Sequence, residues 1–376
     1  MRFDTRLVHC GQRSTPGSGD IVPPVHIATT YDRFAQDPPR LFYSRGENPT
    51  REALEECLAA LEDAPYCAVF SSGQAAATAA LSLLSPGQRL VSSHDIYGGT
   101  YALFESLARF GIRVDYVDST DPAELRQALA ADTAMVWVET PSNPLLELTD
   151  LAEAAELARE CGAVLVVDNT FASPALQRPL DFGADVSLYS TTKFIAGHAD
   201  VLGGALVCRD ADLHGRFVAH RTVTGGVPSG FDCYMVHRGV KTLSLRVARQ
   251  TATAQALADV LCASTAVDEV KYPGLRAHPQ HHLVRAQMSG PGSMVSFRYL
   301  GDPEKLMART ELFACAVSLG GVRSLIECPA LMTHRPVPRA TRIAAGITDD
   351  LIRLSVGIED PADLIEDLQC ALEGDR

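Results

Sequence analysis

A single lysine, Lys193, stands in the segment SLYSTTKFIAGHADVLGG (187–204), among small, hydroxyl-bearing and apolar side chains. The segment contains no carboxylate before Asp200. A lysine shielded from water loses part of its proton affinity, and its neutral amine can then act as a nucleophile or a base. The segment therefore predicts a Schiff-base lysine, with Ser190 and Thr192 as candidate phosphate ligands.

Two other segments place polar groups where predicted strands end. VLVVDNT puts Asp168 after an apolar run, where a carboxylate needs a cation or an N–H partner. A structural cap is the alternative for Asp168. VFSSGQAAA puts Ser71, Ser72 and Gly73 where a strand turns into a helix. That turn is either a phosphate site at a helix N-terminus or an ordinary N-cap with a tight turn.

The three sites together match the requirements of pyridoxal phosphate (PLP). The lysine would form the Schiff base, Asp168 would keep the pyridine nitrogen protonated, and the Ser-Ser-Gly turn would bind the phosphate. A cofactor-free Schiff-base lyase would leave Asp168 and the turn without a task. A non-catalytic protein that retains the fold is a further alternative.

Alternating strands and helices are expected to position these groups. YCAVFSSG, TAMVWVET and AVLVVDNT contain continuous apolar runs separated by helical segments, starting with a helix from Arg51. This pattern predicts an α/β fold with a parallel sheet buried on both faces, and ligands in such a sheet bind beyond the carboxyl ends of the strands. We expect an irregular arm over 1–50, a cofactor-binding domain over 51–230 and a smaller α+β domain over 231–376.

Composition excludes several classes of function. The 376 residues carry a formal net charge of -13 with scattered Lys and Arg, which argues against nucleic-acid and anionic-membrane partners. No apolar run approaches the roughly 20 residues of a membrane span. The start MRFDTRLVHCGQ lacks the apolar core of a signal peptide, so a cytoplasmic location is expected. Ten cysteines without a C-x-x-C pair are typical of reduced thiols, and no metal site is expected.

The chain resembles the Cys/Met-metabolism family of PLP enzymes, which includes cystathionine gamma-synthases and gamma-lyases. The resemblance covers nearly the whole chain and is carried by ordered motifs, among them PPVHIATTY, YSRGENPTR, FSSGQAA, DIYGGTY, VETPSNP, VVDNTFASP, YSTTKFIAGH, LGGVRSLIECPALMTH and LIRLSVGIEDPADLIEDL. It implies the type I aminotransferase-like fold, with a mostly parallel central sheet and a smaller α+β C-terminal domain. It also implies a homotetramer built from two catalytic dimers, whose N-terminal arms contact neighbouring subunits.

The resemblance also implies roles for single residues. The cofactor would be bound by Lys193, Asp168, Tyr97, Ser72, Gly73, Gln74, Ser190 and Thr192, and by Tyr43 and Arg45 from a neighbouring subunit. The substrate carboxylate would be bound by Asn143, Ser324 and Arg353. Lys193 would shuttle protons, helped by Tyr97. Plain alternatives are a buried aromatic for Tyr97, a structural ion pair for Arg353, and ordinary loop residues at Tyr43 and Arg45.

Two positions at which members of the family differ from one another or from this chain bear on the substrate. Gly99 in YGGT matches the cystathionine enzymes, whereas methionine gamma-lyases usually carry Cys there. In LGGVRSL, Arg323 stands where cystathionine-handling members typically have Glu. If Arg323 binds the substrate's distal end, it should favour an anionic or neutral distal group; the alternative is a surface ion pair.

The function expected from the resemblance is PLP-dependent γ-elimination or γ-replacement on a sulfur-containing or homoserine-derived amino acid. The enzyme would be a lyase or transferase of transsulfuration, within methionine and cysteine metabolism and amino-acid biosynthesis. The alternatives are a β-lyase, a methionine gamma-lyase, and a specialised γ-lyase for an amino acid with an anionic or neutral distal group.

Overall fold

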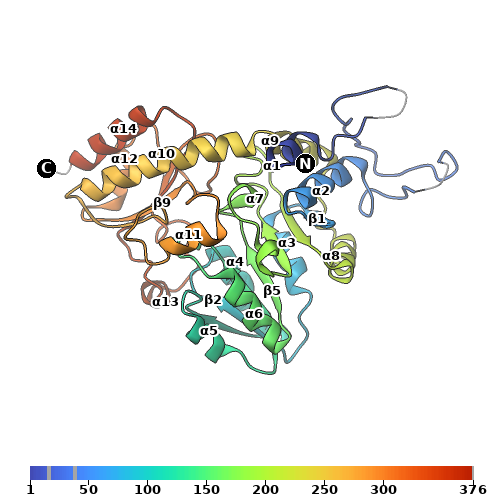
Figure 1. Cartoon of the computed structure of the whole chain (residues 1–376), viewed down its shortest axis with the longest axis horizontal. Coiled ribbons are helices and arrows are strands. Elements are labelled where there is room, and N and C mark those ends of the chain that lie inside the picture. The colour runs from blue at the N-terminus through green and yellow to red at the C-terminus, as the bar shows by residue number, and fades with distance from the viewer. Residues whose placement is uncertain (15–17, 37–39, 375–376) are drawn as a thin grey trace.

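The computed structural model describes residues 1–14, 18–36 and 40–374, and two β-sheets organise them (Figure 1). The larger sheet has seven strands in the order β1-β7-β6-β5-β4-β2-β3. Their bounds are β1 Tyr66–Phe70, β2 Arg89–Ser93, β3 Arg113–Val117, β4 Thr133–Glu139, β5 Val164–Asp168, β6 Val186–Tyr189 and β7 Gly204–Cys208. Neighbours from β6 to β3 pair in parallel, whereas β7 is antiparallel to both β6 and β1.

The larger sheet is buried on both faces because successive apolar side chains point to opposite sides. Leu165 and Val167 of β5 join a core shared with α2, α6 and α9, and Val166 between them joins a second core shared with α3, α4 and α8. The α/β class and the mostly parallel sheet predicted from the sequence are confirmed.

Along the chain, helices precede, separate and follow the strands. Their bounds are α1 Phe3–His9, α2 Pro49–Leu61, α3 Gly73–Leu81, α4 Gly98–Glu105, α5 Pro122–Ala128, α6 Leu151–Cys161, α7 Ser173–Leu176, α8 Ala211–Thr224, α9 Gly230–Val240, α10 Leu243–Ala263, α11 His281–Gln287, α12 Pro303–Arg309, α13 Arg339–Ala344 and α14 Pro361–Glu373, with 3-10 turns η1 Ser106–Phe110 and η2 Pro179–Phe182. None of the described helices is both long and apolar enough to span a membrane.

The smaller sheet belongs to the C-terminal part of the chain, at the left of Figure 1. Its order is β10-β11-β12-β9-β8, with bounds β8 Val267–Lys271, β9 Met294–Tyr299, β10 Ala314–Cys315, β11 Leu325–Glu327 and β12 Leu351–Ser355. Its core is shared with α10, α12 and α14. A smaller α+β C-terminal part is thus confirmed, while the exact domain boundaries at 50 and 230 stay predictions.

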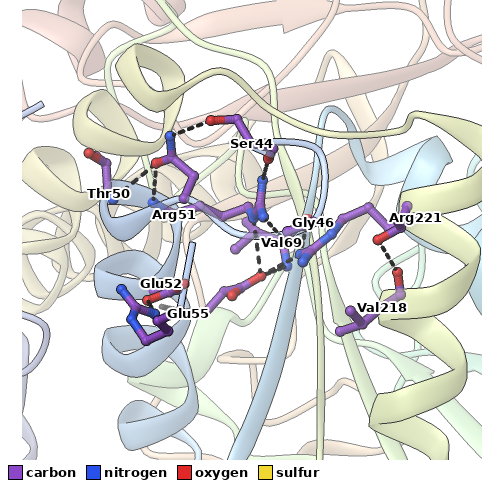
Figure 2. Close-up of polar contacts among 12 residues, drawn as sticks. Ser44, Gly46, Thr50, Arg51, Glu52, Glu55, Val69, Val218 and Arg221 are labelled. Carbon is purple, nitrogen blue, oxygen red and sulfur yellow. Dashed lines mark hydrogen bonds and ion pairs between the residues drawn. The ribbon is translucent and has the colours of Figure 1, made fainter. Parts of the chain in front are cut away.

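A buried polar network anchors the end of the N-terminal arm, the segment before α2 (Figure 2). Arg51 donates 2.8 Å to the Ser44 carbonyl and also donates to the Gly46 carbonyl. Glu55 pairs with Arg221 of α8 and accepts from the Val69 amide of β1 at 3.0 Å. α2 begins at Pro49, two residues before the predicted start, because Asn48 caps the amides of residues 50 and 51.

Candidate active site

A cavity of about 240 Å³ lies where the ends of β4 and β5 meet the start of α3 and the turn before β11. Ten of the residues predicted from the sequence line it: Ser72, Gly73, Gln74, Tyr97, Asn143, Asp168, Ser190, Thr192, Lys193 and Arg353. The larger sheet brings most of them together, because its parallel strands end at the same edge.

Lys193 follows β6 and points its amine into the cavity, where Nζ donates to Ser318 Oγ at 2.8 Å. Burial and the positive charge of Arg353 lower the pKa of the lysine to about 8, and Glu327 acts in the opposite direction. The neutral amine is therefore accessible near neutral pH, as the sequence predicted for a catalytic lysine.

Asp168 ends β5 and is 8% exposed. Its Oδ1 accepts from the Thr170 amide at 3.0 Å. Burial raises the pKa of Asp168 to about 6, although its hydrogen bonds with Thr170 act against the shift. A buried carboxylate that is ionised at neutral pH can hold a pyridine nitrogen protonated.

The start of α3 offers free hydrogen-bond donors. Ser72 Oγ accepts from the Ala75 amide at 3.1 Å, and its carbonyl accepts from the Ala76 amide. Within the described chain, the amides of Gly73 and Gln74 have no acceptor. A Cβ at Gly73 would lie 2.9 Å from the Cβ of Ser190, so a larger residue would close the space between α3 and the lysine segment. Helix N-termini with free amides bind anions such as phosphate.

The two hydroxyl candidates beside Lys193 differ. Ser190 Oγ has no hydrogen-bond partner among the described residues and lies beside Gly73. Thr192 Oγ1, in contrast, donates to the Gly203 carbonyl at 3.2 Å and accepts from the Gly203 amide at 3.0 Å. Ser190 is thus the hydroxyl placed to bind a phosphate, and Thr192 is already engaged with the turn before β7.

Arg353 of β12 closes the cavity on the side of the smaller sheet and is fully buried. It donates to Asn143 Oδ1 at 2.6 Å and to the Ser318 carbonyl at 3.2 Å, and it pairs with Glu327 at 2.8 Å. Glu327 also accepts from Thr333 at 2.8 Å. The structural ion pair considered as an alternative does exist, but Arg353 lines the cavity as well, where a guanidinium can bind a carboxylate.

Two of the predicted substrate residues lie elsewhere. Ser324 is buried outside the cavity; its hydroxyl donates to Glu359 at 2.9 Å and accepts from the Gly357 amide at 2.9 Å. Arg323 is exposed and does not line the cavity. The cavity is lined instead by Val317 and Ser318, which precede the two glycines of the motif. The roles of Ser324 and Arg323 in substrate binding stay predictions.

Ser318 was missed although its motif was noted. Ser318 has a positive φ of 93°, and Gly320 has a φ of 75°. Gly320 packs so closely against the lysine segment that a Cβ on it would lie 2.6 Å from the Phe194 amide nitrogen. This tight turn brings Ser318 against Lys193. A positive φ at a non-glycine residue leaves no mark in the sequence, whereas the two glycines could have indicated a close approach.

Glu139, at the end of β4, is the other missed residue. It lines the cavity opposite Asp168 in the paired strand, and its Oε2 accepts from the Tyr97 amide at 2.9 Å. The Tyr97 side chain is 40% exposed at the cavity, so it is not the buried aromatic considered as an alternative. The sequence did contain a signal for Glu139: in VETPSNP it is a carboxylate at the end of a predicted strand, four residues before Asn143.

Tyr43 and Arg45 do not line the cavity of their own chain. They border a separate hollow of about 360 Å³ together with residues before α9. Arg45 donates to the Thr222 carbonyl at 2.7 Å, and its guanidinium lies 5.6 Å from the centre of the Tyr43 ring. Their predicted action in a neighbouring subunit stays a prediction.

The cavity's donor set fits PLP. Free amides and the Ser190 hydroxyl stand at one end, the buried carboxylate of Asp168 lines the cavity, and the amine of Lys193 is placed beside them. The phosphate, the pyridine nitrogen and the carbonyl carbon of that cofactor need these three kinds of partner.

Comparisons with known proteins agree with this chemistry. A family model described as Cys/Met metabolism PLP-dependent enzyme matches residues 4–373. A cystathionine beta-lyase from Coxiella burnetii is 44% identical over 380 residues, covering 98% of this chain and 97% of that protein. A cystathionine gamma-synthase from Mycobacterium bovis is 45% identical over 378 residues, covering 98% of this chain and 96% of that protein.

Two solved structures are more similar in sequence. Two structures of CalE6 from Micromonospora echinospora are 63% identical to this chain, with TM-scores of 0.98 and 0.95, and cover 100% and 99% of both chains. One is described as a cystathione gamma lyase and the other, in apo form, as a methionine gamma lyase. The matches extend over every segment that lines the cavity.

Proposed function

Because the chain belongs to the Cys/Met metabolism PLP-dependent enzyme family, we propose that it catalyses γ-elimination or γ-replacement on a sulfur-containing or homoserine-derived amino acid. The observation that carries the proposal is the amine of Lys193 in a cavity that also presents Asp168, Arg353 and the free amides of α3. Elimination from a sulfur amino acid is the reaction we favour.

The geometry supports the following assignment of the residues that would hold the cofactor. Lys193 would bind it covalently, Asp168 would pair with its ring nitrogen, and Gly73, Gln74 and Ser190 would bind its phosphate. When bound, PLP supplies an electron sink for the electron pair left at Cα after proton loss.

The chain's own groups would position the substrate and move the protons. Arg353, held by Asn143 and Glu327, is placed to bind the substrate α-carboxylate. The Lys193 amine, with its pKa near 8, is placed to take the Cα proton and to return a proton later. Ser318 accepts from Lys193 and so fixes the direction of that amine.

The mouth of the cavity favours a neutral distal group on the substrate. Val317 and Leu202 line it and are 55% and 67% exposed, and Leu319 adds a third apolar side chain. Apart from Glu139 and Asp168, the cavity lining of the described chain contains no carboxylate that could meet a distal ammonium group. These features support a methionine-like substrate whose sulfur carries a small apolar group, in line with one of the descriptions of CalE6.

Cystathionine is the second candidate substrate. Gly99 stands two residues after Tyr97, and a Cβ there would lie 2.4 Å from the Tyr97 ring. A cysteine, usual in methionine gamma-lyases, would displace the ring, so Gly99 favours the cystathionine-type arrangement. The curated relatives named as cystathionine enzymes support the same candidate.

We also propose that the active unit is a homotetramer of two catalytic dimers, with Tyr43 and Arg45 completing a neighbour's site. The arm exposes large apolar side chains, including Ile21 at 86%, Ile27 at 83% and Phe42 at 74%, which a second copy could cover. Mixing Arg45→Ala and Lys193→Ala chains tests this. Shared sites would recover activity, because one site of each mixed dimer regains both groups; separate sites would not.

The first test is an absorbance spectrum of the purified protein with PLP. We expect visible colour that Lys193→Ala abolishes. Methionine, cystathionine and O-acylated homoserines are then compared by 2-oxobutanoate release, with methanethiol or cysteine measured as co-product. A chain that stays colourless would overturn the proposed function, and a higher kcat/KM for cystathionine would select the second candidate.

A further inference from the structure

Glu139 is a cavity residue without a task in the proposed reaction. It is 4% exposed and stands at the carboxyl end of β4, directly opposite Asp168 in the register of β4 and β5. Its backbone amide is fixed by Ser93 Oγ at 3.2 Å. A buried carboxyl group at a ligand cavity is costly unless it has a function or complete partners.

The partner of Glu139 is the backbone of Tyr97. Tyr97 is the N-cap residue of α4, and its own side chain makes no capping hydrogen bond. Glu139 Oε2 instead accepts from the Tyr97 amide at 2.9 Å. On the other side, a Cβ at Gly98 would lie 2.4 Å from the Thr333 carbonyl, so the chain at Tyr97 is held between β4 and the segment after β11.

The ring of Tyr97 itself is not fixed by any hydrogen bond from residues 1–14, 18–36 or 40–374. The phenol has no hydrogen-bond partner among the described residues, and the side chain is 40% exposed. Where the ring stands is therefore set by its backbone. Glu139 holds the amide of the Ile96–Tyr97 peptide unit, and His334 Nε2 lies 3.2 Å from the carbonyl of the same unit.

The charge of Glu139 follows from the groups that face it. These are Asp168 on β5, Asp95 after β2 and Arg353 on β12, besides the Tyr97 amide. Burial raises the pKa of Glu139 well above its usual range; Asp168 and Asp95 add to the rise, while the Tyr97 amide and Arg353 oppose it. The register pair places Glu139 and Asp168 on neighbouring strands, so the negative charge of one disfavours ionisation of the other.

We propose that Glu139 is a positioning residue that, by accepting from the Tyr97 amide at the end of β4, holds Tyr97 at the cavity beside Asp168. The inference rests on the part of the proposed function in which Tyr97 and Asp168 contact PLP. It does not depend on which amino acid is the substrate.

The test measures the dissociation constant of PLP before any substrate is added. Glu139→Gln copies the neutral acid and keeps an oxygen for the Tyr97 amide, so we expect a change below about threefold. Glu139→Ala removes the acceptor and should weaken binding by about tenfold. In the Tyr97→Ala background the same Glu139→Ala change should cost less than about threefold, because the residue it positions is gone.

A matched control is Glu62, which is fully buried and accepts from the Tyr189 hydroxyl outside the cavity. Glu62→Ala should show no coupling to Tyr97→Ala, which separates positioning from a general effect of losing a buried acid. Should Glu139→Ala not fold, Glu139→Met, which is close to glutamate in length, replaces it in the cycle.

Three outcomes overturn the inference. Wild-type protein that does not take up PLP overturns the proposed function and the inference together. If the wild-type protein binds PLP, two results overturn the inference alone. One is that Glu139→Gln weakens PLP binding as much as Glu139→Ala does. The other is that Glu139→Ala weakens PLP binding equally in the wild-type and the Tyr97→Ala backgrounds.

Discussion

Two clusters of buried arginine and glutamate lie in different parts of the molecule and have different partners. The arm cluster consists of Arg51, Glu55 and Arg221 (Figure 2). The cavity cluster consists of Arg353, Glu327 and their neighbour Asn143. The three arginines are equally buried, at 1% to 2% exposure.

The partners separate the two clusters. In the arm cluster the guanidiniums donate to main-chain carbonyls of Ser44, Gly46 and Val69, so they join backbone segments far apart in the sequence. In the cavity cluster Arg353 donates to the side chain of Asn143 and to a single carbonyl, and it borders open space. Burial and an ion pair alone therefore do not identify a binding arginine, whereas the kind of acceptor and an adjoining cavity do.

Removing the shared acid of the arm cluster should have the largest effect. Glu55→Ala leaves two buried guanidiniums without their carboxylate, so we expect the free energy of unfolding to fall by about 3–5 kcal/mol. Substrate KM in the folded, PLP-loaded protein should change by less than about threefold. Chemical denaturation and steady-state kinetics measure the two quantities, and a large rise in KM with unchanged stability would contradict the structural role.

The converse change in the cavity cluster is Arg353→Lys. Lysine keeps a positive charge near Glu327 but loses the planar two-point contact to a carboxylate, so kcat/KM should fall by about 100-fold. Stability should change by no more than about 1 kcal/mol. Arg221→Lys is the matched control, and we expect it to lower stability and leave kcat/KM nearly unchanged. Equal kinetic losses in both variants would remove the distinction between the clusters.

A smaller effect should follow from neutralising the acid of the cavity cluster. The positive charge of Arg353 lowers the pKa of Lys193, and Glu327 counteracts it. Glu327→Gln should therefore lower the pKa of Lys193 further below its present value of about 8. Because the neutral amine is the base and is populated above its pKa, the acid limb of the kcat profile should move to lower pH. An unmoved limb, or one moved to higher pH, would mean that Glu327 has no electrostatic effect on the lysine.

The cavity cluster also shows how far the sequence led. Strand-end polar residues such as Asp168 and the lysine after the next strand were found because apolar runs and parallel-sheet topology determine where they lie. The α/β class followed from the same runs. Arg353 was found through its motif, but its pairing with Glu327 joins β12 to β11, and no local pattern predicts that contact.

The differences between the predicted and the observed lining of the cavity come from a tight turn. Ser318 and Val317 reach the cavity because the backbone at Ser318 has positive φ and Gly320 packs against Phe194. From composition alone, Ser324 and Arg323 look equally suitable, being a hydroxyl and a charge in the same motif. Only the path of the turn decides which pair faces the lysine, and that path depends on contacts far away in the sequence.

The smallest effect is expected from a change at Arg323, which belongs to neither cluster. Arg323 is exposed, lies outside the cavity and has no ion-pair partner among the described residues. Its charge is screened by solvent, so Arg323→Glu should change the ratio of kcat/KM between cystathionine and methionine by less than about twofold. Val317→Glu puts the same acid at the mouth of the cavity and should shift that ratio toward cystathionine by about tenfold, because a distal ammonium group gains a partner. If Arg323→Glu moved the ratio more than Val317→Glu, the distal group would lie against Arg323, and exposure would be no guide to which arginine acts on the substrate.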